Sequence, residues 1–353
     1  MKIIFSKLRK IVETHWQKSN PITSIVLTPL SFLYKLASKT RFWLYQQSIL
    51  ASQKHPLPII VIGNLHVGGT GKTPTVIYLA QELTQKGFKV GIVSRGYARN
   101  SHETLQVYIH GSAKKYGDEP LLIAQKTNCP TVVSPQRNHA INYLLNHFPD
   151  LDIIISDDGL QHYQMKRDIE IVVFPYNDVN KPLKLLPNGP LRESLTRLQS
   201  IPFILISNIP EDAINKYQVR ESIASYHSKI FFSKTQSNKL YLLNQPEQVI
   251  QFSFFYHKQV AVACAVANPE RFFSKIEESG ITIRDKIVFQ DHKTLPIKEL
   301  AKQYECVIIT EKDAVKIHNI SLNNVFVLPI TISVESGFPD AVIDYLKEHY
   351  NRN

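Results

Sequence analysis

Residues 58–75, PIIVIGNLHVGGTGKTPT, are the stretch from which the fold is predicted. The β-branched run at 59–62 is typical of a short buried strand. Gly63 and Asn64 end this strand, and a glycine-rich loop leads to Lys72 and Thr73. After Thr73 the apolar residues recur at helical spacing, with Pro74 in the first turn, where a missing N–H costs little. The sequence therefore predicts a strand, a loop and a helix in this order.

This order is the one that a phosphate-binding loop requires. Glycines allow backbone N–H groups to turn toward an anion, and the helix N-terminus adds partial positive charge. Lys72 is predicted to reach the β- and γ-phosphates, and the Thr73 hydroxyl to hold Mg²⁺. His66 stands where the usual motif has its first glycine, so an ordinary glycine turn is the alternative. The predicted nucleotide-binding residues are Val67, Gly68, Gly69, Thr70, Gly71, Lys72, Thr73 and Pro74.

Composition indicates a globular protein with a preference for anions. The chain has 353 residues, 43% hydrophobic and 20% charged, which excludes disordered and fibrous classes. The net charge of +11 favours phosphate, nucleic acid or acidic lipid as a partner. Three cysteines without C-x-x-C spacing are typical of buried thiols in a reducing compartment and make a zinc site improbable.

Residues 1–50 form a basic, aromatic-rich region with eight Lys or Arg residues and one acid, Glu13. No uninterrupted apolar run reaches about 18 residues, so no transmembrane helix is expected, and Pro29 interrupts the best candidate for a signal peptide. Thr28 and Pro29 are predicted to cap and begin a helix with a wide apolar face. Such a helix favours association with an anionic membrane surface. A basic helix packed on the domain, with solvated lysines, is the alternative.

Acidic residues follow two further segments at positions suited to catalysis. The apolar run at 151–156 ends in Asp157 and Asp158, as in enzymes that place a carboxylate near Mg²⁺. A strand at 89–93 leads to Arg95 and Tyr97, which we expect to face the same crevice. Asp118 precedes a proline and an apolar helix, so spacing alone leaves it an ordinary helix-start residue.

The remaining pattern predicts an α/β fold. We expect a P-loop NTPase-like three-layer α/β/α domain with a mainly parallel sheet, a smaller C-terminal α/β lobe and an N-terminal amphipathic membrane-associating helix. The expected boundaries are 1–50 for the basic region, 51–215 for the P-loop core domain, 216–330 for the smaller lobe, and 331–353 for a helix that packs back on the body.

Seven motifs together resemble the tetraacyldisaccharide 4′-kinase family, the lipid A 4′-kinases of Gram-negative bacteria. The resemblance runs nearly end to end and joins the phosphate loop to six further stretches, namely SRGY at 94–97, GDEP at 117–120, DDGLQH at 157–162, LRE at 191–193, DH at 291–292 and TEKDA at 310–314.

The resemblance implies transfer of the γ-phosphate of ATP to the 4′-hydroxyl of a tetraacylated glucosamine disaccharide 1-phosphate, which gives lipid IVA. It implies ATP and Mg²⁺ as cofactors and a place at the cytoplasmic face of the inner membrane. By the same resemblance Asp118 is the general base paired with His292, while Lys72, Thr73, Asp157 and Asp158 serve ATP and Mg²⁺. The groups it places around the phosphate and disaccharide are Arg95, Tyr97, Arg137, Gln161, His162, Arg192 and Glu193. Because Asp118 and His292 fall in different predicted lobes, we expect the lobes to close over substrate.

Two other classes of protein are alternatives to this assignment. The first is a phosphate-loop GTPase or metallochaperone-type ATPase, a switch or carrier without an acceptor hydroxyl. Reading guanine would need Asn/Thr-Lys-x-Asp, whereas Lys312 and Asp313 are adjacent. A nucleic-acid-binding module would agree with the net charge, but no recognition-helix or RNA-binding signature is present. The expected partners are therefore the glycolipid substrate and the inner-membrane lipid surface, with no nucleic acid and no obligate protein partner.

Overall fold

The chain forms two compact units, each made of separate stretches of sequence. The computed structural model describes residues 11–16, 18, 20–210, 213–226, 228–237, 239–318 and 320–350, so residues 1–10 of the predicted basic region lie outside it. Unit 1 comprises described residues within 1–72, 158–233 and 340–353, and unit 2 comprises those within 73–157 and 234–339. The boundaries expected at residues 50, 215 and 330 follow the order of the chain and stay a prediction.

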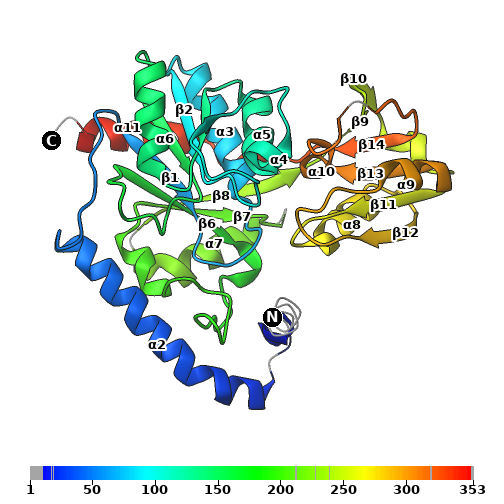
Figure 1. Ribbon diagram of the computed structural model, residues 1–353. Coiled ribbons are helices and arrows are strands. Elements are labelled where there is room, and N and C mark those ends of the chain that lie inside the picture. Colours follow the sequence, from blue (N-terminus) through cyan, green and yellow to red (C-terminus); the bar gives the residue numbers. More distant parts are fainter. Residues whose placement is uncertain are drawn as a thin grey trace. The chain divides into compact units, whose positions relative to one another are not determined.

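Unit 1 is built on parallel strands. β1 (Ile59–Gly63), β6 (Ile169–Pro175), β7 (Phe203–Ser207) and β8 (Lys229–Gln236) are hydrogen-bonded in the order β8–β7–β6–β1 (Figure 1). Every residue of β1 and β7 is buried, as expected for parallel strands that are covered on both faces. The unit also contains α7 (Ala213–Ile223) and the short 3₁₀ helices at Tyr176–Asp178, Leu195–Ser200 and Ala224–Tyr226. The C-terminal helix α11 (Phe338–Tyr350) packs its Tyr345 ring 5.5 Å from the Phe203 ring.

Helix α2 (Pro21–Gln46) is the long N-terminal helix of unit 1, drawn in blue in Figure 1. It begins eight residues earlier than the predicted start at Pro29, because Asn20 caps it by accepting from the backbone N–H of Thr23 at 3.1 Å. Pro29 lies inside the helix, and Thr28 Oγ1 donates to the Ser24 carbonyl at 2.7 Å one turn before it. The predicted cap at Thr28 is therefore wrong, although the predicted helix is present.

The first sheet of unit 2 contains β2 (Val90–Ser94), β3 (Leu105–Gln106), β4 (Thr131–Val133) and β5 (Ile153–Asp157). Their order is β5–β2–β4–β3, parallel except for β3 against β4. The helices of this part are α3 (Lys72–Gln85), whose first residue belongs to unit 1, with α4 (Ala113–Tyr116), α5 (Asp118–Thr127) and α6 (Arg137–His147). The carboxyl ends of β2 and β5 therefore lie side by side, and both carry residues predicted for the site.

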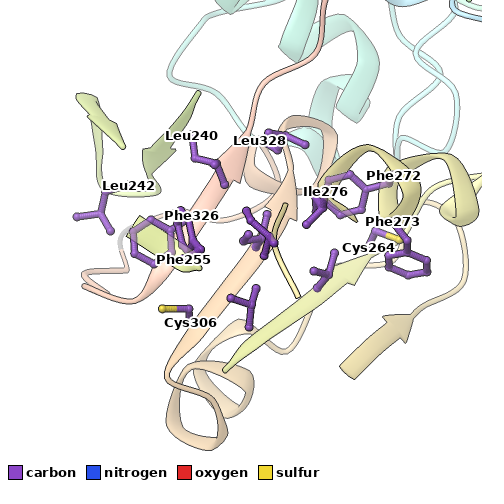
Figure 2. Packing of buried hydrophobic residues seen from close by; sticks show 14 residues of the cluster. Leu240, Leu242, Phe255, Cys264, Phe272, Phe273, Ile276, Cys306, Phe326 and Leu328 are labelled. Atoms are coloured by element: carbon purple, nitrogen blue, oxygen red, sulfur yellow. The ribbon is translucent and has the colours of Figure 1, made fainter. Parts of the chain in front are cut away.

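The second sheet of unit 2 has six strands in the order β10–β9–β14–β13–β11–β12. These are β9 (Leu240–Leu242), β10 (Gln245–Ile250), β11 (Val260–Cys264), β12 (Ile283–Val288), β13 (Cys306–Thr310) and β14 (Val325–Leu328). Alternate residues of β11 and β13 face opposite sides. Val262 and Ile308 join a cluster with Phe273 of α8 (Pro269–Glu278) (Figure 2), and Ala263 joins one with Leu300 of α9 (Ile297–Gln303).

A third apolar cluster of unit 2 contains Tyr116, Leu121 and Ala124 together with Val315, the residue after helix α10 (Glu311–Ala314). This cluster seats α10 against α5. The short strand β15 (Thr331–Val334) and a 3₁₀ turn at Phe252–Phe255 complete the elements of the second part of the unit. The strands predicted at 59–62 and 89–93 are present as β1 and β2, most of β5 falls in the apolar run at 151–156, and the helix predicted after Thr73 is α3, whereas β4 and α6 were not predicted.

Candidate active site

The phosphate loop of unit 1 connects β1 to the start of α3 at Lys72. Gly68 and Gly71 have φ values of 106° and 97°, a conformation that glycine adopts without steric cost. Asn64, which is fully buried, donates from Nδ2 to Thr70 Oγ1 at 2.9 Å, and Ser207 Oγ donates to the Thr70 carbonyl at 2.8 Å. These two hydrogen bonds fix Thr70 in the loop before α3, and the first turn of α3 contains no acidic residue. The arrangement is the one that an anion-binding loop requires.

The surroundings of His66 show why a residue other than glycine can stand at the first glycine position of the usual motif. Its ring is buried, lies edge-on to Phe174 with centroids 4.9 Å apart, and places Nε2 3.5 Å from Asp178. The backbone of His66 is not left-handed, so the position does not require glycine. Burial lowers the pKa of His66, although Asp178 opposes this effect. The histidine therefore packs beside β6.

Two positively charged side chains of unit 1, those of Lys72 and Arg192, lie close to Asp158. Lys72 Nζ lies 3.7 Å from Asp158 Oδ1, and Arg192 lies 3.3 Å from the same oxygen. Arg192 also donates to Gln161 Oε1 at 3.3 Å, and Gln161 Nε2 donates to the Asn64 carbonyl at 3.1 Å. Asp158 has a φ of 46°, an uncommon backbone conformation that is often found at functional sites. The structure thus brings together four predicted site residues: Lys72, Asp158, Gln161 and Arg192.

The loop at 184–192 links helix α2 to the phosphate loop within unit 1. On one side Ser31 Oγ donates to the Leu185 carbonyl at 2.8 Å, and Tyr34 Oη donates to the Arg192 carbonyl at 2.9 Å. On the other side the Val67 N–H donates to the Pro190 carbonyl at 2.8 Å, and the Arg192 N–H donates to the Leu65 carbonyl at 2.6 Å. One short segment therefore holds both the N-terminal helix and the nucleotide loop.

Asp157 ends β5 in unit 2 and is almost fully buried. Ser94, at the end of the neighbouring strand β2, donates from Oγ to Asp157 Oδ2 at 2.9 Å. Arg137 is also buried, and it donates to the backbone carbonyls of Ser134 and Asp157 at 3.2 and 2.9 Å. Ser94 thus orients the predicted metal-binding carboxylate, and Arg137 holds the backbone of the strand end that carries it.

A tight glycine corner positions Asp118 in unit 2. Gly117 has a φ of 94°, and a Cβ at this position would lie 3.3 Å from the Gly96 Cα. The two predicted motifs SRGY and GDEP therefore meet backbone to backbone. Asp118 is the first residue of α5, and its Oδ1 accepts from the Glu119 N–H at 2.9 Å. A carboxylate at a helix N-terminus is stabilised by the helix dipole.

Asp118 and His292 form a hydrogen-bonded pair. Nδ1 of His292 donates to Asp118 Oδ2 at 2.9 Å, because an ionised carboxylate can only accept. His292 has a φ of 65°, and the Tyr97 ring lies 5.0 Å from its ring. Both members belong to unit 2 and are already joined. The pair is therefore formed in this structure, and the expectation that lobes close over substrate stays a prediction.

The charges around this pair keep Asp118 ionised. Burial alone would raise the pKa of Asp118, but the hydrogen bond from His292 and the positive charges of Lys312, His292 and Lys316 together lower it below 3.8. Lys312 lies 3.0 Å from Glu119, 3.4 Å from Asp291 and 3.9 Å from Asp118. Asp118 therefore keeps its proton-accepting form throughout the neutral range.

The other predicted site residues differ in exposure. Arg95 and Tyr97 are exposed, whereas His162 is half-buried. Glu193 is buried, accepts from Tyr163 Oη at 2.6 Å and lies 3.5 Å from Arg197. These contacts of Glu193 stay within unit 1 and tie the loop at 184–192 to the segment that follows it.

Sequence reasoning did not assign roles to Lys312 and Lys316. Lys312 belongs to the TEKDA motif, which had contributed only to the family resemblance, and Lys316 lies two residues beyond it. The available signal was the TEKDA motif itself, since a charged cluster directly after a buried parallel strand is a place where functional side chains gather.

A glycine-rich loop between a buried parallel strand and a helix, with carboxylates at the end of another parallel strand, defines a P-loop nucleotide-binding α/β protein. The family model for tetraacyldisaccharide-1-P 4′-kinase (LpxK) matches residues 23–347 of this chain. The chain therefore belongs to the tetraacyldisaccharide 4′-kinase family, and the predicted resemblance is confirmed.

Individual relatives agree with this assignment. A tetraacyldisaccharide 4′-kinase of Neisseria meningitidis serogroup C is 40% identical over 345 residues, covering 97% of both chains. One from Legionella pneumophila is 39% identical over 322 residues, covering 90% of this chain and 91% of the relative. The crystal structure of LpxK from Aquifex aeolicus in complex with ATP matches with a TM-score of 0.74 and 26% identity, over 92% of this chain and 99% of that one. The predicted P-loop α/β fold is thereby confirmed.

Proposed function

We propose that this protein transfers the γ-phosphate of ATP to the 4′-hydroxyl of tetraacyldisaccharide 1-phosphate, forming lipid IVA. The observation that carries the proposal is the Asp118–His292 pair at 2.9 Å in a chain of the tetraacyldisaccharide 4′-kinase family. A nucleotide switch needs only a phosphate loop, whereas transfer to a sugar hydroxyl also needs a group that accepts the hydroxyl proton.

The phosphate loop supplies the binding half of this chemistry. The backbone N–H groups of residues 67–73 would surround the phosphates, and Pro74, which has no N–H, would follow them. Lys72 would neutralise charge on the β- and γ-phosphates. Arg192, which contacts Asp158 and Gln161, and Gln161, which contacts Asn64, would orient groups at the edge of the same loop. Positioning and charge neutralisation provide most of the rate enhancement in phosphoryl transfer.

The residues fit a magnesium ion by donor chemistry. Among the described residues no group of three or more His, Cys, Asp or Glu side chains could hold a metal by itself. Mg²⁺ prefers one or two carboxylates completed by water and substrate phosphates, and Thr73, Asp157 and Asp158 offer one hydroxyl and two carboxylates. When bound, Mg²⁺ neutralises charge on the phosphates. Ser94 keeps the Asp157 carboxylate oriented for this role.

Asp118 with His292 would accept the proton of the acceptor hydroxyl. Asp118 is the general base in this proposal, and His292 orients it and shares the proton. The exposed Arg95 and Tyr97, together with His162, would contact the disaccharide or its 1-phosphate. The buried Arg137 and Glu193 would shape the site by holding the segments that carry these groups.

Helix α2 would hold the enzyme at the cytoplasmic face of the inner membrane. Its Ser31 and Tyr34 hydroxyls donate hydrogen bonds to unit 1, whereas most of its large apolar side chains are exposed. The exposed set is Ile22, Ile25, Val26, Leu30, Phe32, Leu33, Leu36 and Trp43. The helix carries lysines and an arginine but no acid. In the part of the chain that the structure describes, no helix has the length and apolar character needed to span a bilayer.

A direct assay tests the function. Purified protein is incubated with γ-labelled ATP, Mg²⁺ and the disaccharide monophosphate in mixed detergent micelles, and we expect label on the lipid. Absence of label from the lipid, with a folded protein, contradicts the proposal.

Vesicle flotation tests the role of α2 with two matched variants. Leu33→Glu puts a charge in the exposed apolar face and should release the protein from vesicles that contain anionic lipid. Gln46→Glu adds the same charge at an exposed polar position of the helix and should leave binding nearly unchanged. Equal flotation of both variants would exclude the apolar face as the membrane contact.

A further inference from the structure

Lys312 lies at the centre of a ring of carboxylates in unit 2. Its Nζ is 3.0 Å from Glu119 Oε1, 3.4 Å from Asp291 Oδ1 and 3.9 Å from Asp118 Oδ2. Glu119 and Asp118 begin α5, Asp291 precedes His292, and Lys312 itself belongs to α10. One ammonium group therefore links three separate segments around the Asp118–His292 pair.

Lys316 reaches the same carboxylate from a second direction. Its Nζ is 3.9 Å from Asp118 Oδ2, and its side chain is only 5% exposed. It donates to Asp313 Oδ1 at 2.7 Å and to the Lys293 carbonyl at 3.0 Å. These bonds fix the ammonium group, so its charge stays directed at Asp118 and at the backbone beside His292.

The anchoring of α10 shows why these lysines are held so firmly. Thr310 Oγ1 accepts from the Asp313 N–H at 3.1 Å and donates to Asp313 Oδ2 at 2.7 Å. The other contact of Asp313 Oδ2 is the Ala265 N–H at 3.0 Å, at the end of β11. Asp313 thus connects Lys316 to two strands of the six-stranded sheet. Lysine side chains on a fixed turn lose less conformational entropy when they bind than mobile ones do.

Four carboxylates face the two lysines: Asp118, Glu119, Asp291 and Asp313. His292 and the Tyr97 ring complete the surroundings of Asp118. Burial favours the neutral form of Lys312, but Glu119, Asp118 and Asp291 raise its pKa, so it stays charged. Without Lys312, the carboxylates of Asp118, Glu119 and Asp291 would lose the ammonium group that they share, since Lys316 contacts only Asp118 among them, and neighbouring like charges favour protonation.

We propose that Lys312 and Lys316 are positioning residues of phosphoryl transfer, which hold the Asp118 carboxylate ionised and aligned toward His292. They act through Asp118 and need not touch either substrate. This inference rests on the proposed function, because it assigns a role within the same proton-accepting site.

The closing experiment compares the pH dependence of kcat for wild type and Lys312→Met. Glu119 and Asp291 are about one-third exposed, so water can solvate them when the lysine is removed, and the variant should fold. We expect kcat to fall about tenfold or more at neutral pH, and the acid limb to move upward by about one pH unit. The KM for ATP should stay unchanged. Lys312→Arg, which keeps the charge, should restore most of kcat and the wild-type acid limb.

Lys126→Met is the matched control. Lys126 also joins α5 to α10, but its ion-pair partner is Glu311. The change therefore removes a lysine that links the same two helices through Glu311 and not through Asp118. Its pH profile should follow wild type. Lys312→Gln serves as the second variant if Lys312→Met lowers the thermal unfolding midpoint by several degrees.

Three results decide the matter. An upward-shifted acid limb in the neutral variants, absent from Lys312→Arg and Lys126→Met, supports the proposal. A wild-type pH profile in a folded Lys312→Met or Lys312→Gln protein overturns it, and so does a selective rise in the KM for ATP, which would make Lys312 a nucleotide ligand. Failure of the wild type to label the glycolipid counts against the proposed function instead.

Discussion

Two strand-to-helix corners of the molecule each present a lysine, at β1–α3 and at β13–α10. In the first corner a glycine-rich loop leads to Lys72, and the first turn of α3 contains no acid. In the second corner Thr310 caps the helix with its own side chain, and Glu311 and Asp313 occupy the first turn. The first corner has no acidic side chain at the start of its helix, whereas the second is capped by Thr310 and places Lys312 beside carboxylates of the protein. The role of a lysine that follows a buried strand therefore depends on the side chains that surround the N-terminus of the next helix.

Removing the lysine of the first corner should have the largest effect. Lys72→Met deletes the charge that we propose neutralises the β- and γ-phosphates, and transfer should fall by at least about 10²–10³-fold, as for other groups that stabilise charge in a transition state. The labelled-ATP assay measures this loss. Turnover near that of wild type would show that Lys72 does not serve the phosphates, so that the lysines of the two corners do not differ in this role.

The carboxylate that the second corner serves should rank next. Asp118→Asn keeps the shape of the side chain but removes the proton acceptor, and kcat should fall by roughly 10²-fold or more. ATP affinity, measured by equilibrium titration, should change little because Asp118 faces His292 and the lysines. Weaker ATP binding with normal kcat would instead make Asp118 a nucleotide ligand.

Thr310→Val is expected to affect stability more than chemistry. The variant keeps the volume of a buried residue but loses the helix cap and the hydrogen bond to Asp313. The free energy of unfolding should fall by about 1–2 kcal/mol, measured by denaturant titration. If stability is unchanged, the side-chain cap does not hold the second corner in place.

The smallest effect concerns pH. Because the folded-state pKa of Asp118 lies below 3.8, its ionisation stabilises the fold above that pH and the contribution disappears as the pH falls further. The wild type should therefore lose stability relative to Asp118→Asn below about pH 4, and the two should respond alike between pH 5 and 7. Denaturant titrations across this range provide the comparison.

The sequence predicted much of this architecture because local patterns determine it. The run at 59–62 and the helical spacing after Thr73 give β1 and α3 without tertiary information. The start of α2 was wrong, because Thr28-Pro29 satisfies the usual rules for a cap, while Asn20 satisfies them too and lies earlier. Strand β4 has only three residues, too few for a period to be recognised.

The residues of the site could be predicted from the sequence, but the contacts between them could not. The pairing of Asp118 with His292 came only from family resemblance, since 174 residues separate them in the chain. The approach of Lys312 and Lys316 depends on α10 packing against α5 through Val315, which no local pattern encodes. Glu193 was expected near substrate, and its bond to Tyr163 depends on folding of the segment between them.

The loop at 184–192 has a mechanical consequence. Hydrogen bonds lose most of their strength once donor and acceptor separate by much more than about 3.2 Å. A displacement of α2 by a fraction of its own diameter must therefore either sever the bonds at Ser31 and Tyr34 or carry the carbonyls of Leu185 and Arg192 with it. Pro190 and Arg192 are bonded in turn to the backbone of Val67 and Leu65. A force on α2 would therefore reach, through this one stretch of backbone, the glycine-rich loop that we propose binds the nucleotide.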